Sequence, residues 1–162
     1  MKSFIQKHNL ILFIIILLIT FCISKYCIQF TLIQGDSMLP AYHNWQIVVV
    51  SKFDAPYTYG DVITFTSEKS HATIVKRIVA LPGDTVQISA GTLYVNCSPS
   101  DVQIANKEIT NSGIAATAIT LGDDEYFVLG DNYDVSKDSR YPEIGCIKKS
   151  AIIGKVIFPH DS

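Results

Sequence analysis

No run of basic residues occurs in this 162-residue sequence, which carries 13 lysines and arginines against 15 aspartates and glutamates. The formal net charge is therefore -2. Proteins that bind nucleic acid usually carry a basic patch or stripe, so this composition argues against a nucleic-acid partner. The length allows one modest globular domain and a membrane segment, but not two full domains.

Spaced metal ligands are also missing. The four cysteines form no CxxC pair, and the four histidines are scattered along the chain. We therefore expect no metal site and no cofactor. Cys97 and Cys146 could form a disulfide in an oxidising compartment, and their spacing leaves this pairing open.

An uncharged apolar segment runs from Leu10 to Ile23 and is typical of the core of a transmembrane helix. Fourteen helical residues cover only about 21 Å of a hydrocarbon layer that is ~30 Å thick. We therefore expect the span to continue through Tyr26 to Phe30, with Lys25 snorkelling to the interface. A cleaved signal peptide is the alternative, but no small-x-small cleavage site follows the segment, which favours a retained anchor.

The predicted organisation is thus an amino-terminal tip and anchor at 1–30, followed by a domain at 31–162. Lys2 and Lys7 precede the span and only Lys25 follows it closely, so the positive-inside rule places the domain outside the cytoplasm.

The rest of the chain is rich in short β-branched and aromatic runs that end at Gly, Pro or Asp, which is typical of strands and turns. Ala90-Gly91 between two such runs predicts a hairpin. We expect a mostly β domain, a coiled antiparallel sheet or barrel, with residues 98–120 as a loop or small accessory excursion. The predicted strands are Gln46–Ser51, Val62–Thr66, Thr73–Leu81, Thr85–Ser89, Thr92–Asn96, Tyr126–Leu129 and Ile152–Phe158.

Ser37 is the first candidate catalytic residue. It follows Gly35-Asp36 and precedes Pro40, a pattern that favours an exposed turn with the Ser37 N–H left out of any strand ladder. An unpaired N–H beside a nucleophile forms half of an oxyanion hole. By itself, however, Gly-Asp-Ser is an ordinary turn sequence.

Lys76 is the second candidate, in the apolar run that ends at Pro82-Gly83-Asp84. Strand alternation places Lys76 on the same face as Ile74 and Ile78. Such burial lowers the pKa of a lysine, so that it can act as a neutral general base. The alternative is a charge that protects an edge strand from aggregation.

A dense polar run, residues 130–140, follows the last apolar strand of this region. Its composition is typical of an ordered loop at a functional site. Within it, Asp138 and Arg140 can form an ion pair, and Ser136 can offer its hydroxyl to an amine. A solvated surface loop is the alternative.

Together, these segments resemble the type I signal peptidases, including the mitochondrial inner-membrane and conjugative-transfer peptidases. The matching motifs are Ser37-Met38-x-Pro40, Lys76-Arg77 with Pro82-Gly83-Asp84, and Gly130-Asp131-Asn132 with Ser136-x-Asp138-Ser139-Arg140. The order of these motifs, the spacing between them and the apolar segment before them all agree with the family pattern.

The resemblance implies a Ser/Lys dyad, with Ser37 as nucleophile and Lys76 as general base. It further implies that Ser136 orients the lysine amine and that Met38 packs beside the dyad. Asp138 and Arg140 would form a structural ion pair, and Asp131 would balance Arg77. The implied substrates are exported preproteins with small residues before the cleavage site, at the plasma (inner) membrane.

Two features depart from the family pattern. Many bacterial members carry Ser or Thr where this chain has Gly35, so the oxyanion hole would depend on the Ser37 N–H, with Gly35 as the second candidate contributor. Between Arg140 and Gly145 lie four residues, where the family usually has two.

Three other functions stay open on the sequence. One is a peptidase dedicated to a single substrate, of the conjugative-transfer type. Another is a self-cleaving repressor-type protease, but this class would need a DNA-binding or soluble amino-terminal part in place of the apolar segment at Leu10 to Ile23. The third is a non-enzymatic, membrane-anchored β-domain binding module, for which an intact Ser37 and Lys76 would be unnecessary.

Overall fold

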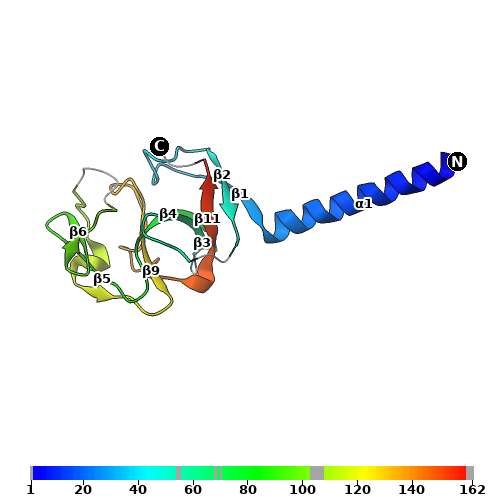
Figure 1. Ribbon diagram of the computed structural model, residues 1–162. Helices are drawn as coiled ribbons and strands as arrows, with labels where there is room; N and C mark the ends of the chain where they lie inside the picture. Colours follow the sequence, from blue (N-terminus) through cyan, green and yellow to red (C-terminus); the bar gives the residue numbers. More distant parts are fainter. Residues whose placement is uncertain (1, 54–55, 68, 70, 103–107, 160–162) are drawn as a thin grey trace.

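A computed structural model of the chain describes residues 2–53, 56–67, 69, 71–102 and 108–159, and for 2–7 and 23–24 the backbone alone. Two antiparallel sheets build the domain, and a long helix projects away from it (Figure 1). The prediction of a mostly β domain with antiparallel sheets is confirmed.

Helix α1 spans Lys2–Tyr26 and leads directly into the first strand. The expected extension of the apolar span through Phe30 is wrong, because β1 begins at Ile28 and pairs along its whole length with β2. Within the described part of the chain, no helix combines the length and the apolar character that a membrane crossing requires.

The larger sheet has seven strands in the order β1-β2-β11-β3-β4-β9-β10. All seven predicted strands of the chain are present, five in this sheet and two in the smaller one, with bounds that differ by at most one residue. The strands of the larger sheet are β1 (Ile28–Leu32), β2 (Ile47–Ser51), β3 (Val62–Thr66), β4 (Thr73–Ala80), β9 (Glu125–Leu129), β10 (Ile147–Lys148) and β11 (Ile152–Phe158).

The smaller sheet lies on the side of the domain remote from α1 and has the order β7-β6-β5-β8 (Figure 1). Ala90 and Gly91 both have positive φ, 46° and 75°, as a tight two-residue hairpin requires. Part of the predicted 98–120 loop is regular, with two short strands and a 3-10 turn, while its residues 103–107 lie outside the described residues. The elements here are β5 (Thr85–Ser89), β6 (Thr92–Val95), β7 (Ser98–Pro99), η1 (Gly113–Ala116) and β8 (Ile119–Thr120); η2 (Lys149–Ala151) precedes β11.

Strand β4 lies inside the larger sheet between β3 and β9, and its residues from Val75 to Ala80 are all buried. Its alternating side chains enter different apolar clusters: Val75 joins Ile33 and Met38, whereas Ile78 packs with Ile63 and its neighbours. Each fully buried aliphatic side chain stabilises the fold by roughly 1.5–3 kcal/mol. The alternation therefore fixes which face of β4 each residue presents.

The first half of β4 keeps one edge unpaired. On one side β3 pairs with Thr73 through Arg77, but on the other side β9 pairs only from Arg77 onward. Strand β1 stands at the end of the larger sheet and pairs with β2 alone. The sheet coils so that β1 and the unpaired half of β4 line the same groove.

The cysteine side chains form no disulfide. Cys97 and Cys146 are both free thiols, and burial raises the pKa of Cys146.

Candidate active site

Ser37 lies in the loop between β1 and β2, at a turn closed by backbone hydrogen bonds. Ile33 N–H donates to the Gln46 carbonyl at 2.9 Å, and Tyr42 N–H donates to the Met38 carbonyl at 2.9 Å. The loop therefore returns the chain to the sheet while Ser37 stays half-buried at its tip. This is the exposed turn that Gly35-Asp36 and Pro40 predict.

Asn132 holds this turn against the polar loop at 130–140. Its backbone N–H donates to the Ser37 carbonyl at 3.0 Å, and its side-chain amide donates to the Asp36 carbonyl at 3.2 Å. No role for Asn132 is predicted from the sequence, although the Gly-Asp-Asn motif contains it. An amide side chain that directly follows a buried carboxylate was the signal that could have identified it.

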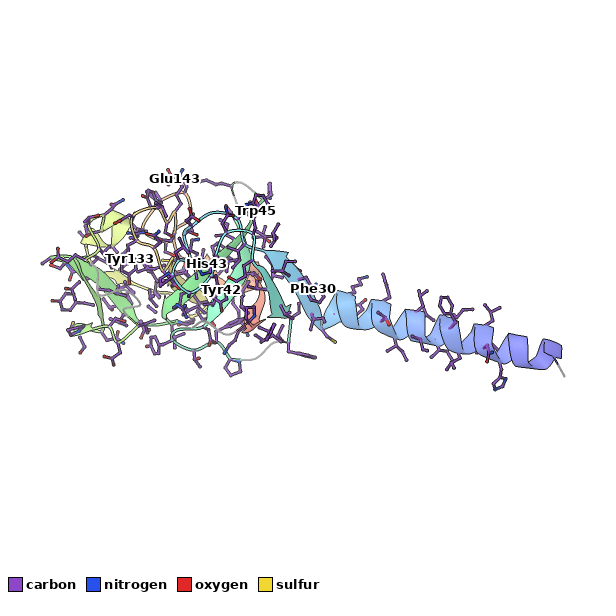
Figure 2. All side chains as sticks on the ribbon, turned by 90° about the horizontal axis from the view of Figure 1, so that it is seen from above. Phe30, Tyr42, His43, Trp45, Tyr133 and Glu143 are labelled. Atoms are coloured by element: carbon purple, nitrogen blue, oxygen red, sulfur yellow. The ribbon has the colours of Figure 1, made fainter. Side chains whose placement is uncertain are left out.

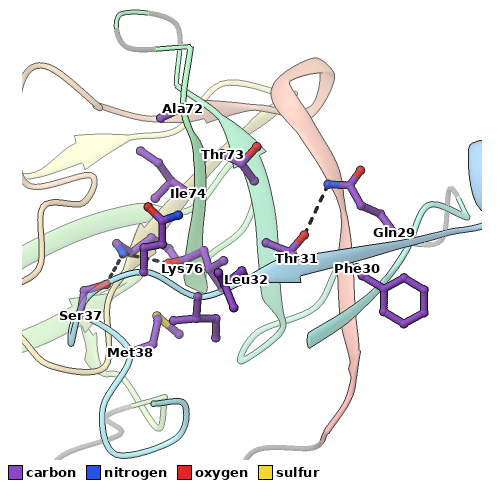
Figure 3. Close-up of a pocket in the computed structure, with 13 residues that line it drawn as sticks. Gln29, Phe30, Thr31, Leu32, Ser37, Met38, Ala72, Thr73, Ile74 and Lys76 are labelled. Carbon is purple, nitrogen blue, oxygen red and sulfur yellow. Dashed lines mark hydrogen bonds between the residues drawn. The ribbon is translucent and has the colours of Figure 1, made fainter. Parts of the chain in front are cut away.

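Lys76 projects from β4 toward Ser37. Its Nζ lies 2.8 Å from Ser37 Oγ and donates to the Val75 carbonyl at 2.8 Å (Figure 3). Figure 3 also shows Lys76 and Ile74 on the same side of β4, with Thr73 on the other, as the alternation predicts. The two candidate catalytic residues, 39 positions apart in the chain, are thus in direct contact.

The Lys76 side chain is almost completely buried, with 4% of its surface exposed. Burial lowers the pKa of Lys76 to about 8, while the charges of Asp138 and Asp131 raise it and that of Arg140 lowers it. Near pH 8 a large fraction of such a lysine is neutral and able to accept the Ser37 proton.

Arg77, the neighbour of Lys76, points to the opposite face and forms a buried bidentate pair with Asp131. Its Nε donates to Asp131 Oδ1 at 3.0 Å and its Nη2 to Oδ2 at 2.7 Å, while Nη1 donates to the Gly60 carbonyl at 2.8 Å. This pair joins β4 to the residue that precedes Asn132.

A second buried ion pair organises the polar loop itself. Arg140 contacts both oxygens of Asp138, through Nε at 2.8 Å and Nη2 at 2.9 Å, and also donates to the Tyr133 carbonyl at 2.9 Å. Asp138 Oδ2 accepts the Gly130 N–H at 3.0 Å. The loop is therefore closed on itself rather than solvated.

Ser136 reaches the same region. Its hydroxyl is buried and makes no hydrogen bond within the described part of the chain, so the expected bond to Lys76 is not formed. A Cβ on Gly130 would collide with both Ser136 Oγ and the Ser37 carbonyl oxygen. Glycine at 130 is what lets the polar loop approach the Ser37 turn this closely.

The Ser37 N–H donates no hydrogen bond to any described residue and is available to an oxyanion. Gly35 does not supply a second donor, because its N–H donates to Asn44 Oδ1 at 2.9 Å. Gly35 also has a φ of 88°, a conformation that favours glycine over any residue with a side chain. The suggested contribution of Gly35 to the oxyanion hole is therefore not supported by its geometry.

Ser37 and Lys76 lie at one end of a groove of about 500 Å³ between β1 and β4. The buried side chains of Ile33, Met38 and Val75 line it as well. Met38, fully buried, packs against this cluster, as expected of a residue beside the dyad. None of the described histidines lines this groove, and in the same part of the chain no three His, Cys, Asp or Glu side chains are grouped to hold a metal ion.

Sequence comparison matches this chain to known peptidases over nearly its whole length. The family model described as signal peptidase, peptidase S26, matches residues 6–160. Signal peptidase I P of Bacillus subtilis subsp. natto is 31% identical over 173 aligned positions, covering 96% of this chain and 93% of the relative. Signal peptidase IB of Staphylococcus aureus is 32% identical, covering 86% of this chain and 81% of the relative.

A solved structure agrees with the sequence matches. The crystal structure of a signal peptidase I from Enterococcus faecalis V583 superposes with a TM-score of 0.54 at 31% identity, covering 64% of this chain and 98% of that chain. The non-enzymatic binding module is therefore set aside. The chain belongs to the signal peptidase I family, peptidase S26, and is a serine peptidase of that type.

Proposed function

We propose that the chain is a membrane-bound endopeptidase that removes signal peptides from exported preproteins by a Ser37/Lys76 dyad. The single observation that carries this proposal is the 2.8 Å contact between Ser37 Oγ and a buried Lys76 Nζ. Neutral Lys76 takes the hydroxyl proton as Ser37 Oγ attacks the scissile carbonyl carbon. The Ser37 N–H stabilises the resulting oxyanion.

The remaining steps use the same two residues. Collapse of the tetrahedral intermediate breaks the C–N bond, and Lys76 returns its proton to the leaving amine. A water molecule then attacks the Ser37 ester while Lys76 accepts the water proton. When the ester C–O bond breaks, that proton passes to Ser37 Oγ, which restores the starting state.

The groove between β1 and β4 suits an extended peptide. Both bordering segments have backbone edges that no described strand occupies, so a substrate segment can add to them as a further strand. Next to Ser37 the groove is lined by the buried side chains of Met38, Ile33 and Val75, which we infer restrict the adjacent substrate position to a small side chain. This favours substrates with small residues just before the cleavage site.

The polar loop is proposed to position the dyad. Arg77 with Asp131, and Asp138 with Arg140, fix the two ends of the loop. Ser136, buried and without a hydrogen-bond partner among the described residues, is the group that we infer turns its hydroxyl toward the lysine amine during catalysis. Removing one partner of a buried ion pair costs about 3–5 kcal/mol of folding stability. The four charged residues are therefore proposed to support catalysis by holding the loop in place.

We retain the division into an anchor at 1–30 and a catalytic domain at 31–162 as a proposal. Strand β1 begins at Ile28, two residues before the end of the predicted anchor. The side chains of α1 from Leu10 to Ile19 are apolar and about half exposed. Beside the helix, one face of β1, β2 and β11 also presents apolar side chains: Phe30, Leu32, Ile47 and Phe158. Although the described residues include no helix that meets the requirement for a membrane crossing, we infer that both surfaces contact lipid, with α1 as the single anchoring helix and the domain on the extracytoplasmic face of the plasma membrane.

We expect Ser37→Ala and Lys76→Ala each to lower kcat/KM for a precursor by about 10⁴-fold or more. The double variant should have the same kcat/KM as either single variant, because the two residues serve one proton transfer. Lys76→Arg should be equally inactive, since guanidinium does not deprotonate. The assay is cleavage of labelled precursors, with sites read by mass spectrometry.

The matched control is His43→Ala, which replaces an exposed residue outside the groove and should keep normal turnover, as should wild type with a chelator. Near-normal activity of folded Lys76→Arg would refute the dyad. A panel of several precursors also separates a general signal peptidase from one dedicated to a single substrate.

Gly130→Ala tests the positioning role of the polar loop. The added methyl group must displace Ser136 or the Ser37 carbonyl, and a shift near 1 Å at a catalytic group costs about 10²-fold in rate. We expect kcat to fall by about 10²-fold in a variant that circular dichroism shows to be folded. Gly122→Ala, whose Cβ would meet only the Glu125 side chain, should keep wild-type activity, and equal activity of the two variants would contradict the role.

Protease added to intact spheroplasts should degrade the domain that follows α1, because it lies outside the cytoplasm. Lysis should not be needed. If the domain is protected until the membrane is opened, the proposed orientation is wrong, whereas release of the full-length protein by a carbonate wash would contradict the anchor.

A further inference from the structure

The Ser37 N–H is the donor available to an oxyanion, and one peptide bond determines its direction. The second candidate donor, the Gly35 N–H, is already bonded to Asn44. The bond between Asp36 and Ser37 is a trans peptide, so its C=O and N–H lie in one plane and point in opposite directions. A group that binds the Asp36 carbonyl on one side of this peptide therefore fixes where the Ser37 N–H points on the other side.

Asn132 binds that carbonyl. Its side-chain amide donates to the Asp36 carbonyl at 3.2 Å, and its backbone N–H donates to the Ser37 carbonyl at 3.0 Å. One residue therefore holds both peptide groups that flank the proposed nucleophile. The first bond acts on the peptide that carries the oxyanion donor, and the second acts on the peptide that follows Ser37.

The backbone around Asn132 is itself held on both sides. Before it, the buried carboxylate of Asp131 accepts hydrogen bonds from Nε and Nη2 of Arg77. At its other side, the Asn132 carbonyl accepts the Ser136 N–H at 3.1 Å. The polar loop therefore sets the position of the Asn132 side chain independently of the turn to which it binds.

The contact joins loops that follow distant strands of the larger sheet. The loop between β1 and β2 follows the strand at one end of the sheet, whereas residues 130–140 follow β9, close to the other end. In the view of Figure 2, Tyr42 of the first loop lies between Phe30 of β1 and Tyr133 of the polar loop. The coiled sheet brings the two loops together, and Asn132 bonds one to the other.

We propose that Asn132 is a positioning residue for the oxyanion hole and acts through the peptide between Asp36 and Ser37. The inference rests on the proposed function, because it assumes that the Ser37 N–H stabilises the tetrahedral intermediate. A hydrogen bond accepted by the Asp36 carbonyl polarises its peptide and makes the Ser37 N–H a stronger donor, since linked hydrogen bonds strengthen one another. The gain is largest when the substrate oxygen carries a negative charge, which is in the transition state.

Two variants test the proposal, with the full chain in detergent and a precursor that wild type cleaves. Asn132→Ala removes the donor and should lower kcat about tenfold with KM unchanged, because the lost interaction acts in the transition state. Asn132→Asp has nearly the same shape but turns a carboxylate oxygen toward the Asp36 carbonyl, and should lower kcat about 10²-fold. Circular dichroism verifies that each variant is folded, and Asn132→Asp stays decisive if the smaller side chain of Asn132→Ala prevents folding.

The matched control is Asn44→Ala. It removes a side-chain hydrogen bond from the same turn, but this bond is to the Gly35 N–H and not to a peptide that flanks Ser37. Asn44→Ala should keep the wild-type kcat. If Asn44→Ala and Asn132→Ala lower kcat equally, the cause is a general loosening of the turn, and the positioning role is refuted.

A pair of peptide inhibitors gives a readout that a loss of stability alone would not change. A peptide aldehyde forms the oxyanion: Ser37 Oγ adds to the aldehyde carbon, the hydroxyl proton passes to Lys76, and the aldehyde oxygen takes the negative charge. The corresponding peptide alcohol occupies the groove without this step. Asn132→Ala should raise the inhibition constant of the aldehyde about tenfold and leave that of the alcohol unchanged.

The outcomes separate this inference from the proposed function. If the folded wild-type chain cleaves no precursor, the proposed function fails. If wild type cleaves but binds the aldehyde no more tightly than the alcohol, no oxyanion is stabilised and the role of Asn132 fails. If wild type prefers the aldehyde, and folded Asn132→Ala and Asn132→Asp keep its kcat and its aldehyde affinity, the function stands and the positioning role is refuted.

Discussion

The burial of Lys76 is the constraint on which the rest of the site depends. A lysine at the surface is protonated at neutral pH and cannot accept a proton from serine. On β4, between apolar clusters, the same side chain has a pKa of about 8 and lies 2.8 Å from Ser37 Oγ. In the proposed dyad, the sheet therefore both positions Lys76 and lowers its pKa enough for it to act as a base. This burial comes from the packing on the faces of β4, because the edge of the strand at Lys76 is not paired with β9.

That burial requires the surrounding charges to be neutralised. Asp131 and Asp138 would each stabilise the charged form of Lys76, which would oppose its role as a base. Each is held by its own arginine, Arg77 or Arg140, through paired hydrogen bonds. The same ion pairs fix the loop that carries Asn132, which in turn holds the Ser37 turn. The charges that tune the lysine thus also determine where the serine lies.

Much of this arrangement could be predicted from the sequence, because it is recorded in local patterns. Period-two alternation placed Lys76 with Ile74 and Ile78, and turn residues marked the ends of the strands. Contacts between distant segments could not be predicted in this way. The motif around Asn132 marks it as a candidate residue but does not indicate that the Ser37 turn is its partner, and nothing near Gly35 indicates that Asn44 accepts its N–H. Strand β1 was missed because its apolar residues continue the helical run, and only pairing with β2 makes it a strand.

The pH dependence of kcat/KM for a peptide without titratable groups tests the central claim most directly, since it reports the ionisation of the free enzyme's base. In the proposed mechanism only neutral Lys76 accepts the Ser37 proton, so kcat/KM should rise with pH through a single ionisation near 8 and fall tenfold per pH unit in acid. A profile that is flat between pH 6 and 9, or that rises near 6.5 as a histidine base would give, in a protein that stays folded throughout, would contradict the account.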